Sequence, residues 1–585
     1  MKPDTDNEFT RRDFLKLTWG LGAGAVMPPF LAACSGSSTQ EDTFDPPTLT
    51  STNGILEVTF KLEYVDTILP VRNNDTGVFT DTKVHLRSFS SMIPGPTLRI
   101  NAGDTLRINI INNLPPNPPS NDPEHLRYLN STNLHVHGFH VNPGIVRPGV
   151  YGDFVVDDPN MGVKPGESRQ HEFKVEADHP AGAYFYHPHL HGATAIQMAS
   201  GMSGMIIISG GINKVPEIAA ARERVFVLQR PIVDSKGLLE DFATIADFPA
   251  NELGLLVNGR RVPRLTMKSG EVQNWHFVNA AIFNFANLAL EGHTLNMYSQ
   301  DGNPRPNMVP VPPTGNAKGE GVVLAPGNRA SVLVKAGKPG LYQLKTLKFQ
   351  MGRNDEAVQN FLKEDIVAEV EVSDEVKDMA LPAGPLPVPP ALRPITDAEL
   401  AAGGGLKRNV VFRAVFNAPP PGSFNKPPIT TGEASLVVHP GAEIDDWQFQ
   451  RGATIANTVF AVGSLGESAS PNPGMPLEFI PFQSHRALKQ TVPLGSVEEW
   501  TIFNMNEIRH PFHIHVNPIY ITKINGVAIE PYWADTIALP AQGTPEKPTS
   551  VTFRSRFTDF KGLYVLHCHM LVHEDMGMMQ AVDVV

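Results

Sequence analysis

Ten of the chain's 20 histidines fall in four short clusters. The clusters are His135-Val136-His137, His187-Pro188-His189, His510 to His515 and His567 to His573. Each contains a His-x-His pair, and alternate residues of a strand point to the same face, so each pair presents two imidazoles side by side. The four pairs supply eight imidazoles, whereas one ion takes about four to six ligands. They predict a cluster of about three metal ions with open positions for a small ligand.

Cys568 lies between the two histidines of the last pair, so on a strand its side chain faces the opposite way from theirs. A thiolate combined with two imidazoles and a weak thioether is the ligand set of blue copper sites. His510, His573 and Met578 are placed to complete that set. We therefore expect a second kind of metal site, with one copper ion, beside the cluster.

Two short patterns recur three times and predict the scaffold that positions these residues. The first runs from a Gly to an Asn nine residues later through alternating apolar residues: Gly103 to Asn112, Gly270 to Asn279 and Gly495 to Asn504. The second places a Tyr two residues after a Gly: Gly182 to Tyr184, Gly340 to Tyr342 and Gly562 to Tyr564. Both are typical of a turn followed by a strand. Together they predict three β-sandwich domains, over residues 46–212, 213–375 and 405–585.

The second pattern also separates the domains that carry ligands from the one that does not. The residues five and seven positions after its Gly are His187 and His189 in the first domain, Lys345 and Leu347 in the second, and His567 and His569 in the third. The metal cluster is therefore expected between the first and last domains, with the middle domain as a spacer and partial lid. Residues 376–404 form a Pro- and Gly-rich linker, with a short helix from Asp397 to Ala402.

Composition excludes several classes of protein. The 585 residues include 49 Gly and 53 Pro, set between short runs of β-branched and aromatic residues, which is typical of many strands and turns. The net charge is −12 and no basic stretch stands out, so nucleic acid is not expected as a partner. Only two cysteines are present, at positions 34 and 568, which excludes a disulfide framework.

The first 45 residues are interpreted as an export signal and a flexible tether rather than as part of the fold. Arg11-Arg12 precedes a short apolar stretch rich in small residues and resembles a bacterial twin-arginine export signal. Leu31 to Cys34 resembles a lipobox, in which the Cys becomes the lipidated first residue. Residues 35–45 follow as a flexible stalk. We expect export by the twin-arginine machinery to the periplasm or cell envelope, with a lipid anchor at Cys34.

At these motifs the chain resembles the three-domain multicopper oxidases, the laccase-like family, of a bacterial exported type. The resemblance implies an all-β fold of three consecutive cupredoxin-like Greek-key β-sandwiches. It also implies four copper ions: one type 1, one type 2 and a type 3 pair. Electrons from one-electron donors would enter at type 1 and pass through Cys568 and its neighbours to the other three ions, where O₂ is reduced to water.

The resemblance carries over residue by residue. It implies one type 2 and one type 3 ligand for His135 and His137, type 3 ligands for His187 and His189, and type 1, type 2 and type 3 ligands, in that order, for His510, His513 and His515. In the last motif it implies type 3 ligands for His567 and His569, and type 1 ligands for Cys568, His573 and Met578. A thioether at Met578, where many laccases carry Leu or Phe, implies a lower or intermediate redox potential.

Three acidic residues are further candidates. Glu574 directly follows His573 and matches a family residue implicated in proton delivery; the alternative is an ordinary surface or salt-bridged glutamate. Asp153 is the best match to the family's first-domain aspartate near type 2 copper. Asp535 either orients a ligand histidine or is a turn residue. His191 extends the second pair but is not assigned to copper.

Three functions remain open at this point. The first is an oxidase of phenols or similar small-molecule donors, with O₂ as acceptor. The second keeps the copper centre but oxidises a metal ion, Cu(I) or Mn(II), for copper tolerance. The third is a non-catalytic cell-envelope scaffold, against which the intact ligand set argues. A copper nitrite reductase is disfavoured because eight imidazoles exceed what its type 2 site needs.

Overall fold

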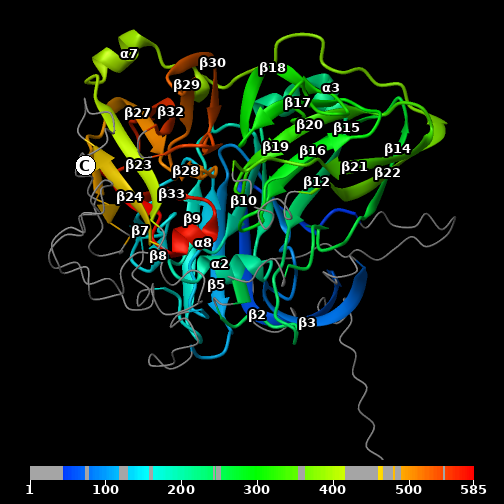
Figure 1. The fold of residues 1–585 in the computed structure, drawn as a ribbon, viewed down its shortest axis with the longest axis horizontal. Coiled ribbons are helices and arrows are strands. Elements are labelled where there is room, and N and C mark those ends of the chain that lie inside the picture. The colour runs from blue at the N-terminus through cyan, green and yellow to red at the C-terminus, as the bar shows by residue number, and fades with distance from the viewer. Residues whose placement is uncertain are drawn as a thin grey trace, which may run out of the picture. The chain divides into compact units, whose positions relative to one another are not determined.

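The computed structural model describes residues 44–72, 78–117, 129–156, 162–241, 244–245, 252–352, 363–415, 459–465, 479–480, 482, 489–544 and 547–585. The expected export signal, the lipobox and most of the stalk lie outside these residues. The described chain forms six β-sheets that pair into three successive sandwiches (Figure 1, blue to teal, green, and yellow to red). The all-β, three-sandwich prediction is thereby confirmed.

The first sandwich is built from two sheets with strand orders β3-β2-β5-β9-β8-β7 and β1-β4-β11-β10-β6. Its strands are β1 (Thr48–Thr50), β2 (Ile55–Arg72), β3 (Phe79–Phe89), β4 (Thr97–Asn101), β5 (Thr105–Asn112), β6 (His135–His137), β7 (Ile145–Arg147), β8 (Val150–Tyr151), β9 (Ser168–Lys174), β10 (Gly182–His187) and β11 (Gly204–Ser209). Helix α2 (Thr194–Ala199) lies between β10 and β11, and η1 (Gly211–Lys214) and α3 (Pro216–Ala220) lead into the second sandwich.

The second sandwich has strand orders β13-β12-β15-β20-β17-β18 and β14-β22-β21-β16-β19. Its strands are β12 (Arg222–Gln229), β13 (Leu256–Val257), β14 (Arg264–Ser269), β15 (Val272–Asn279), β16 (Ala286–Leu290), β17 (Leu295–Gln300), β18 (Asn303–Val311), β19 (Val322–Leu324), β20 (Arg329–Lys335), β21 (Gly340–Thr346) and β22 (Asp365–Val376). The linker that follows holds η2 (Pro390–Leu392) and α7 (Asp397–Ala402), the short helix expected from the sequence.

The third sandwich has strand orders β25-β24-β23-β27-β32-β29-β30 and β26-β34-β33-β28-β31. Its strands are β23 (Lys407–Val415), β24 (Val459–Leu465), β25 (Phe479–Ile480), β26 (Lys489–Val492), β27 (Ser496–Asn504), β28 (Pro511–Ile514), β29 (Ile519–Ile524), β30 (Val527–Ala534), β31 (Thr536–Ala538), β32 (Thr549–Phe557), β33 (Gly562–Cys568) and β34 (Met579–Val584). Helix α8 (Leu571–Asp575) connects β33 to β34. The domain limits proposed from the sequence stay a prediction, because the strand ranges define the sheets and not the boundaries between domains.

The recurring Asn has the same structural task in all three sandwiches. Each closes a central strand, β5, β15 or β27, and is buried. The amide of Asn112 donates to the carbonyls of Asn130 and Val163, and the amide of Asn504 donates to those of Ile508 and Pro540. One bond of each pair holds the backbone just before a histidine cluster, at Asn130 and at Ile508, and the other ties in a later loop, at Val163 and at Pro540. Buried backbone carbonyls need such partners, which explains why an amide side chain stands there.

The end of the expected stalk is part of the fold, which corrects the prediction for residues 44 and 45. Phe44 is buried and packs edge-on against Phe226 of the second sandwich. Asp45 accepts bonds from the guanidinium of Arg224, at 2.9 Å, and from the backbone N–H of Val225, at 2.8 Å. An aromatic ring that buries apolar area and a carboxylate that pairs with a buried arginine both favour order over a solvated tether.

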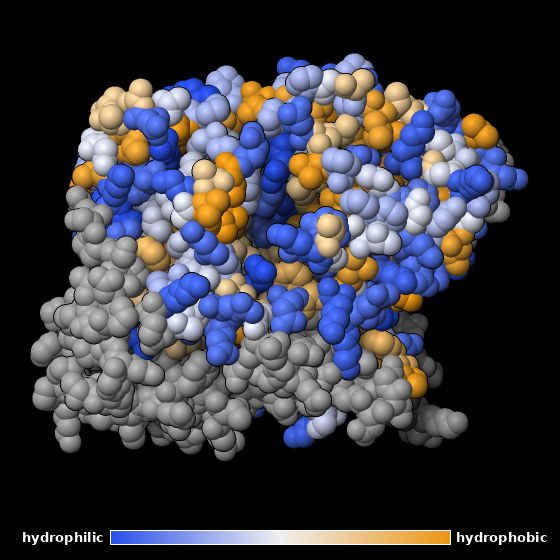
Figure 2. All heavy atoms as spheres, turned by 45° about the horizontal axis from the view of Figure 1, so that its top comes forward, coloured by the Kyte–Doolittle hydropathy of each residue, from blue (hydrophilic) through white to orange (hydrophobic). Residues whose placement is uncertain are grey.

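The exposed large hydrophobic residues of the described chain are spread over many elements, from Leu49 on β1 to Leu563 on β33. On the face shown in Figure 2, hydrophobic atoms alternate with hydrophilic ones. Single exposed apolar side chains of this kind are normal on a folded surface. None of the helices in the described ranges is both long enough and apolar enough to cross a membrane.

Candidate metal centre

Two pairs of strands, one in each outer sandwich, carry most of the histidines that the sequence singled out. In the first sandwich β6 pairs with β10, and His135 lies directly opposite His187. In the third sandwich β28 pairs with β33, and His513 lies opposite His567. Cross-strand neighbours have their Cβ atoms about 4.5–5.5 Å apart. The ladders therefore bring the local His-x-His pairs together two by two.

The two sets of histidines meet across the seam between the outer sandwiches. The rings of His137 and His513 stack with centroids 3.8 Å apart, and so do those of His135 and His515. Three groups have ligand atoms within 4.8 Å of one another: His135, His137 and His513; His137, His187 and His569; and His189, His515 and His567. Each group takes residues from both outer sandwiches. All eight paired histidines predicted from the sequence are therefore brought together.

Several buried ring nitrogens in this cluster have no hydrogen-bond partner. They are Nε2 of His135, Nδ1 of His137, Nε2 of His187, Nδ1 of His189, Nε2 of His513, Nδ1 of His515 and both ring nitrogens of His569. In most of these rings the other nitrogen is held by the protein, as in His187, whose Nδ1 lies 2.8 Å from the carbonyl of Pro188. A buried polar atom without a partner is costly, and a metal ion would relieve that cost. The donor set thus fits bound copper ions.

The electrostatics favour neutral imidazoles, which is the form that binds metal. Burial, together with the neighbouring imidazoles, lowers the pKa of His187 to about 3 and that of His189 to about 4. The same causes hold the pKa of His135, His513 and His569 well below the usual range. The cluster therefore keeps its nitrogen lone pairs free over the ordinary pH range.

Asp153 lies where the sequence predicted an acidic residue beside the cluster. Its Oδ1 is 2.8 Å from Nδ1 of His135 and accepts the backbone N–H of Val136 at 3.1 Å, and its Oδ2 is 3.3 Å from Nδ1 of His515. One carboxylate thus orients one histidine from each outer sandwich. Burial raises the pKa of Asp153 to about 8.

Glu574 is also completely buried and contacts two histidines of the cluster. Its Oε2 lies 2.9 Å from Nδ1 of His567, and its Oε1 lies 3.5 Å from Nδ1 of His189. Burial alone would raise the pKa of Glu574, but the two imidazoles outweigh it and lower the pKa to about 2. Burial excludes a surface glutamate, whereas the contacts with two imidazoles fit the salt-bridged alternative as well as a role in proton delivery.

Asp535 contacts two of the clustered histidines, which favours its interpretation as a residue that orients candidate ligands. Its Oδ1 lies 3.1 Å from Nε2 of His137, and its backbone carbonyl lies 2.9 Å from Nδ1 of His513. The hydroxyl of Thr536 lies 3.1 Å from the same two nitrogens. Both rings are thereby turned so that their unpartnered nitrogens, Nδ1 of His137 and Nε2 of His513, face the cluster.

The expected second site lies on the opposite face of β33. The sulfur of Cys568 is 3.4 Å from Nδ1 of His510 and 3.6 Å from Nδ1 of His573, and the two nitrogens are 3.2 Å apart. The backbone N–H of Met578 donates to the carbonyl of His573 and its carbonyl accepts the N–H of Cys568, which fixes Met578 beside both. Burial raises the pKa of the Cys568 thiol, so a thiolate here needs a nearby cation such as copper.

The other histidines near the motifs have different surroundings. Among the described residues, His191 belongs to none of the candidate metal groups, and its ring packs edge-on against Phe482. His140 lies 3.0 Å from Asp559, and Nδ1 of His171 lies 3.1 Å from the carbonyl of Gly152. Leaving His191 out of the copper ligands agrees with this geometry.

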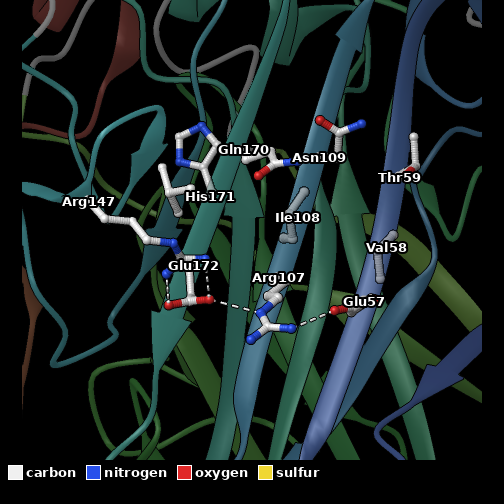
Figure 3. A pocket seen from close by; sticks show the side chains of 11 residues that line it. Glu57, Val58, Thr59, Arg107, Ile108, Asn109, Arg147, Gln170, His171 and Glu172 are labelled. Atoms are coloured by element: carbon white, nitrogen blue, oxygen red, sulfur yellow. Dashed lines mark hydrogen bonds and ion pairs between the residues drawn. The ribbon is translucent and has the colours of Figure 1, made fainter.

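A surface pocket of about 480 Å³ lies elsewhere, over β2, β5, β7, β8 and β9 of the first sandwich, and none of its lining residues belongs to the histidine cluster. Figure 3 shows that its charged side chains point toward one another. Arg107 pairs with Glu57 at 2.7 Å and with Glu172 at 2.8 Å, and Arg147 pairs with Glu172 at 2.6 Å. These ion pairs neutralise the charged side chains of the pocket.

Sequence reasoning missed the contribution of the middle sandwich. Arg329 and Asp301 are completely buried and contact Asp535 or the backbone beside it. They lie more than 200 positions from Asp535 in the sequence. The middle domain is therefore more than a spacer and lid. In the sequence, this contact corresponds only to the Gly-Asn-Arg turn at 327–329, whose residue types do not predict a role near a metal site.

Comparisons with known proteins agree with this geometry. Sequence models of the multicopper oxidase family match residues 73–211, 233–363 and 476–585. The chain is similar to multicopper oxidase mco of Staphylococcus haemolyticus, with 22% identity over 531 residues and 89% of each chain covered. It is also similar to Laccase-2 of Botryotinia fuckeliana, with 23% identity, 85% of this chain and 78% of that protein covered.

Solved structures share the fold. A multicopper oxidase from Campylobacter jejuni, described as a metallo-oxidase, superposes with a TM-score of 0.64 at 20% identity and covers 92% of this chain and 94% of that one. A laccase-like multi-copper oxidase, CueO from Ochrobactrum sp., described as active towards lignin model compounds, gives a TM-score of 0.63 at 19% identity, with 92% and 99% covered.

Proposed function

Since this chain belongs to the multicopper oxidase family, and is thus a copper oxidoreductase that uses O₂, we propose that it couples one-electron oxidation of a phenol-like donor to reduction of O₂ to water. The observation that carries the proposal is the convergence of four His-x-His pairs from two sandwiches on one buried cluster. Beside them lies the Cys568 group, joined to the cluster by the peptide bonds to His567 and His569. A storage site for several electrons and an entry site for single ones are what such a coupling requires.

We assign four copper ions to these residues. His135 and His513 would hold type 2 copper; His137, His187 and His569 would hold one type 3 ion, and His189, His515 and His567 the other; His510, Cys568, His573 and Met578 would hold type 1 copper. Bound copper supplies the one-electron redox chemistry. The chain supplies neutral, oriented imidazoles, a buried thiol and the exclusion of bulk water.

Two carboxyl groups are proposed to pass on the protons that water formation requires, Asp153 as the group that holds a proton near neutral pH and Glu574 as an ionised acceptor that relays one. Glu574 contacts two of the type 3 candidates, and Asp153 contacts His135 and His515, so each lies one imidazole away from the cluster. No other acidic side chain in the described chain lies as close to both halves of the cluster except Asp535, which is already paired with Arg329. A carboxylate in such a position can pass a proton to bound water.

The donor is proposed to approach His573. This residue is 5% exposed, whereas His510, Cys568 and Met578 are completely buried. Phe283 of the second sandwich lies edge-on to the His573 ring, with centroids 6.2 Å apart. A slightly exposed histidine ring beside an aromatic side chain suits a flat organic donor.

Oxygen uptake with alternative donors tests the proposal. The purified, copper-loaded protein is supplied in turn with a phenol, Cu(I) and Mn(II). Uptake with the phenol at full rate, without added copper salt, supports the proposed donor class. Uptake only with a metal ion would instead assign the chain to metal-ion oxidation for copper tolerance. Uptake with none would leave the scaffold role.

We also propose export through the twin-arginine route and anchoring by a lipid on Cys34. The support is the order of Arg11-Arg12, the apolar stretch and the lipobox-like Leu31 to Cys34 in the sequence. The test is fractionation of cells that express Cys34→Ala. Release of the variant from the membrane fraction is expected, and unchanged membrane association would contradict the anchor.

A further inference from the structure

We propose that Arg329 of the ligand-free middle sandwich is a positioning residue for the copper cluster, acting through Asp535 on His137 and His513. The inference rests on the proposed function and deepens it. The middle sandwich contributes no candidate ligand among the described residues, yet its 325–329 turn projects to the seam where the two outer sandwiches meet. Strand β20 begins at Arg329 and lies beside β10 of the first sandwich.

All five N–H donors of the Arg329 side chain have acceptors, and these come from all three sandwiches. Two of the donors form a fork on the Asp535 carboxylate, at 2.7 and 2.6 Å. The other three donate to backbone carbonyls: those of Ala183 at 3.3 Å, Gly327 at 3.1 Å and Asp301 at 3.1 Å. A planar guanidinium is the one side chain that can satisfy this arrangement. The arginine thus holds the plane of the Asp535 carboxylate fixed.

The orientation of that carboxylate matters for two ligands. Oδ1 of Asp535 faces Nε2 of His137, which leaves Nδ1 of His137 as the atom that faces the cluster. The same Oδ1 lies 3.6 Å from Nδ1 of His513, which also meets the backbone carbonyl of Asp535 at 2.9 Å, and this leaves Nε2 of His513 for the cluster. A hydrogen bond to one ring nitrogen decides which of the two binds a metal. Arg329 therefore acts on a proposed type 2 ligand and a proposed type 3 ligand at once.

The backbone around the ion pair is shaped to admit it. A Cβ at Gly138, the residue after His137, would lie 2.1 Å from the guanidinium of Arg329 and 2.7 Å from Oδ2 of Asp535. A Cβ at Gly327 would lie 2.9 Å from the ring of His569. Both glycines also have positive φ angles, of 89° and 86°. Only glycine fits at these two positions. The Arg329–Asp535 ion pair and the 325–329 turn therefore pack directly against the candidate ligand residues.

A neighbouring carboxylate anchors the turn from within the middle sandwich. Oδ1 of Asp301 accepts the backbone N–H of Arg329 at 2.9 Å, and both its oxygens accept the amide of Asn328. The same amide donates to the carbonyl of Thr536 at 2.9 Å. The turn is thereby tied to the residue that follows Asp535, so the positioning is built into the backbone as well as the side chain.

The test compares Arg329→Met, Arg329→Lys and a control, Arg224→Met, in the full-length, copper-loaded protein. Arg224 is also a completely buried arginine of the middle sandwich in an ion pair, but it pairs with Asp45, away from the cluster. Four readouts are taken: copper per chain, the type 2 signal in electron paramagnetic resonance, the blue type 1 band, and kcat. Thermal unfolding of the copper-free proteins is recorded alongside.

For Arg329→Met we expect an altered or lost type 2 signal and a fall of about 10–100-fold in kcat or in affinity for type 2 copper. The blue band per chain should stay, since the bonds of Arg329 go to none of the type 1 residues. Arg329→Lys should restore part of the copper content, because it keeps the charge but not the fork. Arg224→Met should lose stability only.

An unchanged type 2 signal and kcat in Arg329→Met would overturn the inference and leave Arg329 with a purely structural role. If that variant does not fold, Arg329→Lys decides on the same readouts: a changed type 2 signal with an unchanged blue band supports the inference, and no change in either overturns it. A wild-type protein without any type 2 signal would instead refute the proposed function, so the two failures are distinguishable.

Discussion

Replacing Asp153 by Asn should disable the cluster while leaving the Cys568 site intact. The Asp153 carboxyl accepts from Nδ1 of His135 and from the N–H of Val136, and its Oδ2 lies 3.3 Å from Nδ1 of His515. An asparagine keeps one oxygen for the first two donors. It turns its NH₂ group toward His515, so a donor meets a donor. His515 can then pair only by moving its proton to Nε2, the nitrogen that the cluster needs.

The magnitude follows from the contact with His515 that the amide cannot keep. Above the raised pKa of about 8 Asp153 is ionised, and its attraction for Nδ1 of His515 is then replaced by a repulsion in the variant, so the effect is expected in assays above pH 8. A polar contact with a charged group contributes about 1.5–3 kcal/mol. Since about 1.4 kcal/mol corresponds to a factor of ten, this change predicts a decrease of about 10–100-fold in cluster-dependent activity. The same range is found when a residue that orients a metal ligand is removed.

The assay is steady-state oxygen uptake, together with copper per chain and the intensity of the blue band. Asp104→Asn is the matched control, because Asp104 is also buried in the first sandwich and accepts from the hydroxyl of Ser51 and the N–H of Asn101, away from any histidine of the cluster. We expect Asp153→Asn to lose uptake and cluster copper with its blue band unchanged. Full uptake in this variant, or an equal loss in the control, would refute the reasoning.

Three further perturbations have defined outcomes. Cys568→Ser should abolish the blue band, since an alkoxide cannot replace a thiolate, and a copper-loaded variant that stays blue would contradict the type 1 assignment. Asp575→Asn should lower the free energy of unfolding by about 1–3 kcal/mol in a denaturant titration, because the two carboxylate oxygens of Asp575 in the third sandwich accept backbone N–H groups at the start of α2 in the first. Glu172→Gln should cost about 0.5–1 kcal/mol of stability at neutral pH. Hydrogen bonds from Arg147 and Arg107 lower the pKa of Glu172 in the folded protein. The stabilisation by Glu172 is therefore present above its unfolded-state pKa and is lost as the pH falls through the lower folded-state pKa. The free energies of unfolding of wild type and variant should converge in acid, and a constant difference would contradict this.

The parts of the site that local spacing encodes could be predicted from the sequence. A His-x-His pair on a strand places both rings on one face wherever the strand lies, and β6 and β33 show this. The alternation also places Cys568 on the other face, where it meets His510 and His573. The repeated Gly-to-Asn pattern predicted the central strands β5, β15 and β27 with their closing Asn. In each case a period of two residues carries the information.

The contacts made across sandwiches could not be predicted in this way. Arg329 and Asp535 lie 206 positions apart, and a lone arginine in a turn has no periodicity that marks it as buried. The polar neighbours of Phe44 favour a stalk, although this ring fills a place in the second core. Such contacts depend on how finished sandwiches dock, and their partners are set by tertiary packing rather than by local propensity.

The most direct test of the central claim is quantitative electron paramagnetic resonance of the copper-loaded protein, with total copper determined on the same sample. In this account, imidazoles from the two outer sandwiches hold a coupled type 3 pair and a type 2 ion, and Cys568 holds a type 1 ion nearby. The spectrum should therefore contain both a type 1 and a type 2 signal. The silent, coupled pair should leave about half of the bound copper undetected. Copper that is fully detectable, or a spectrum without the type 1 signal, would contradict the account.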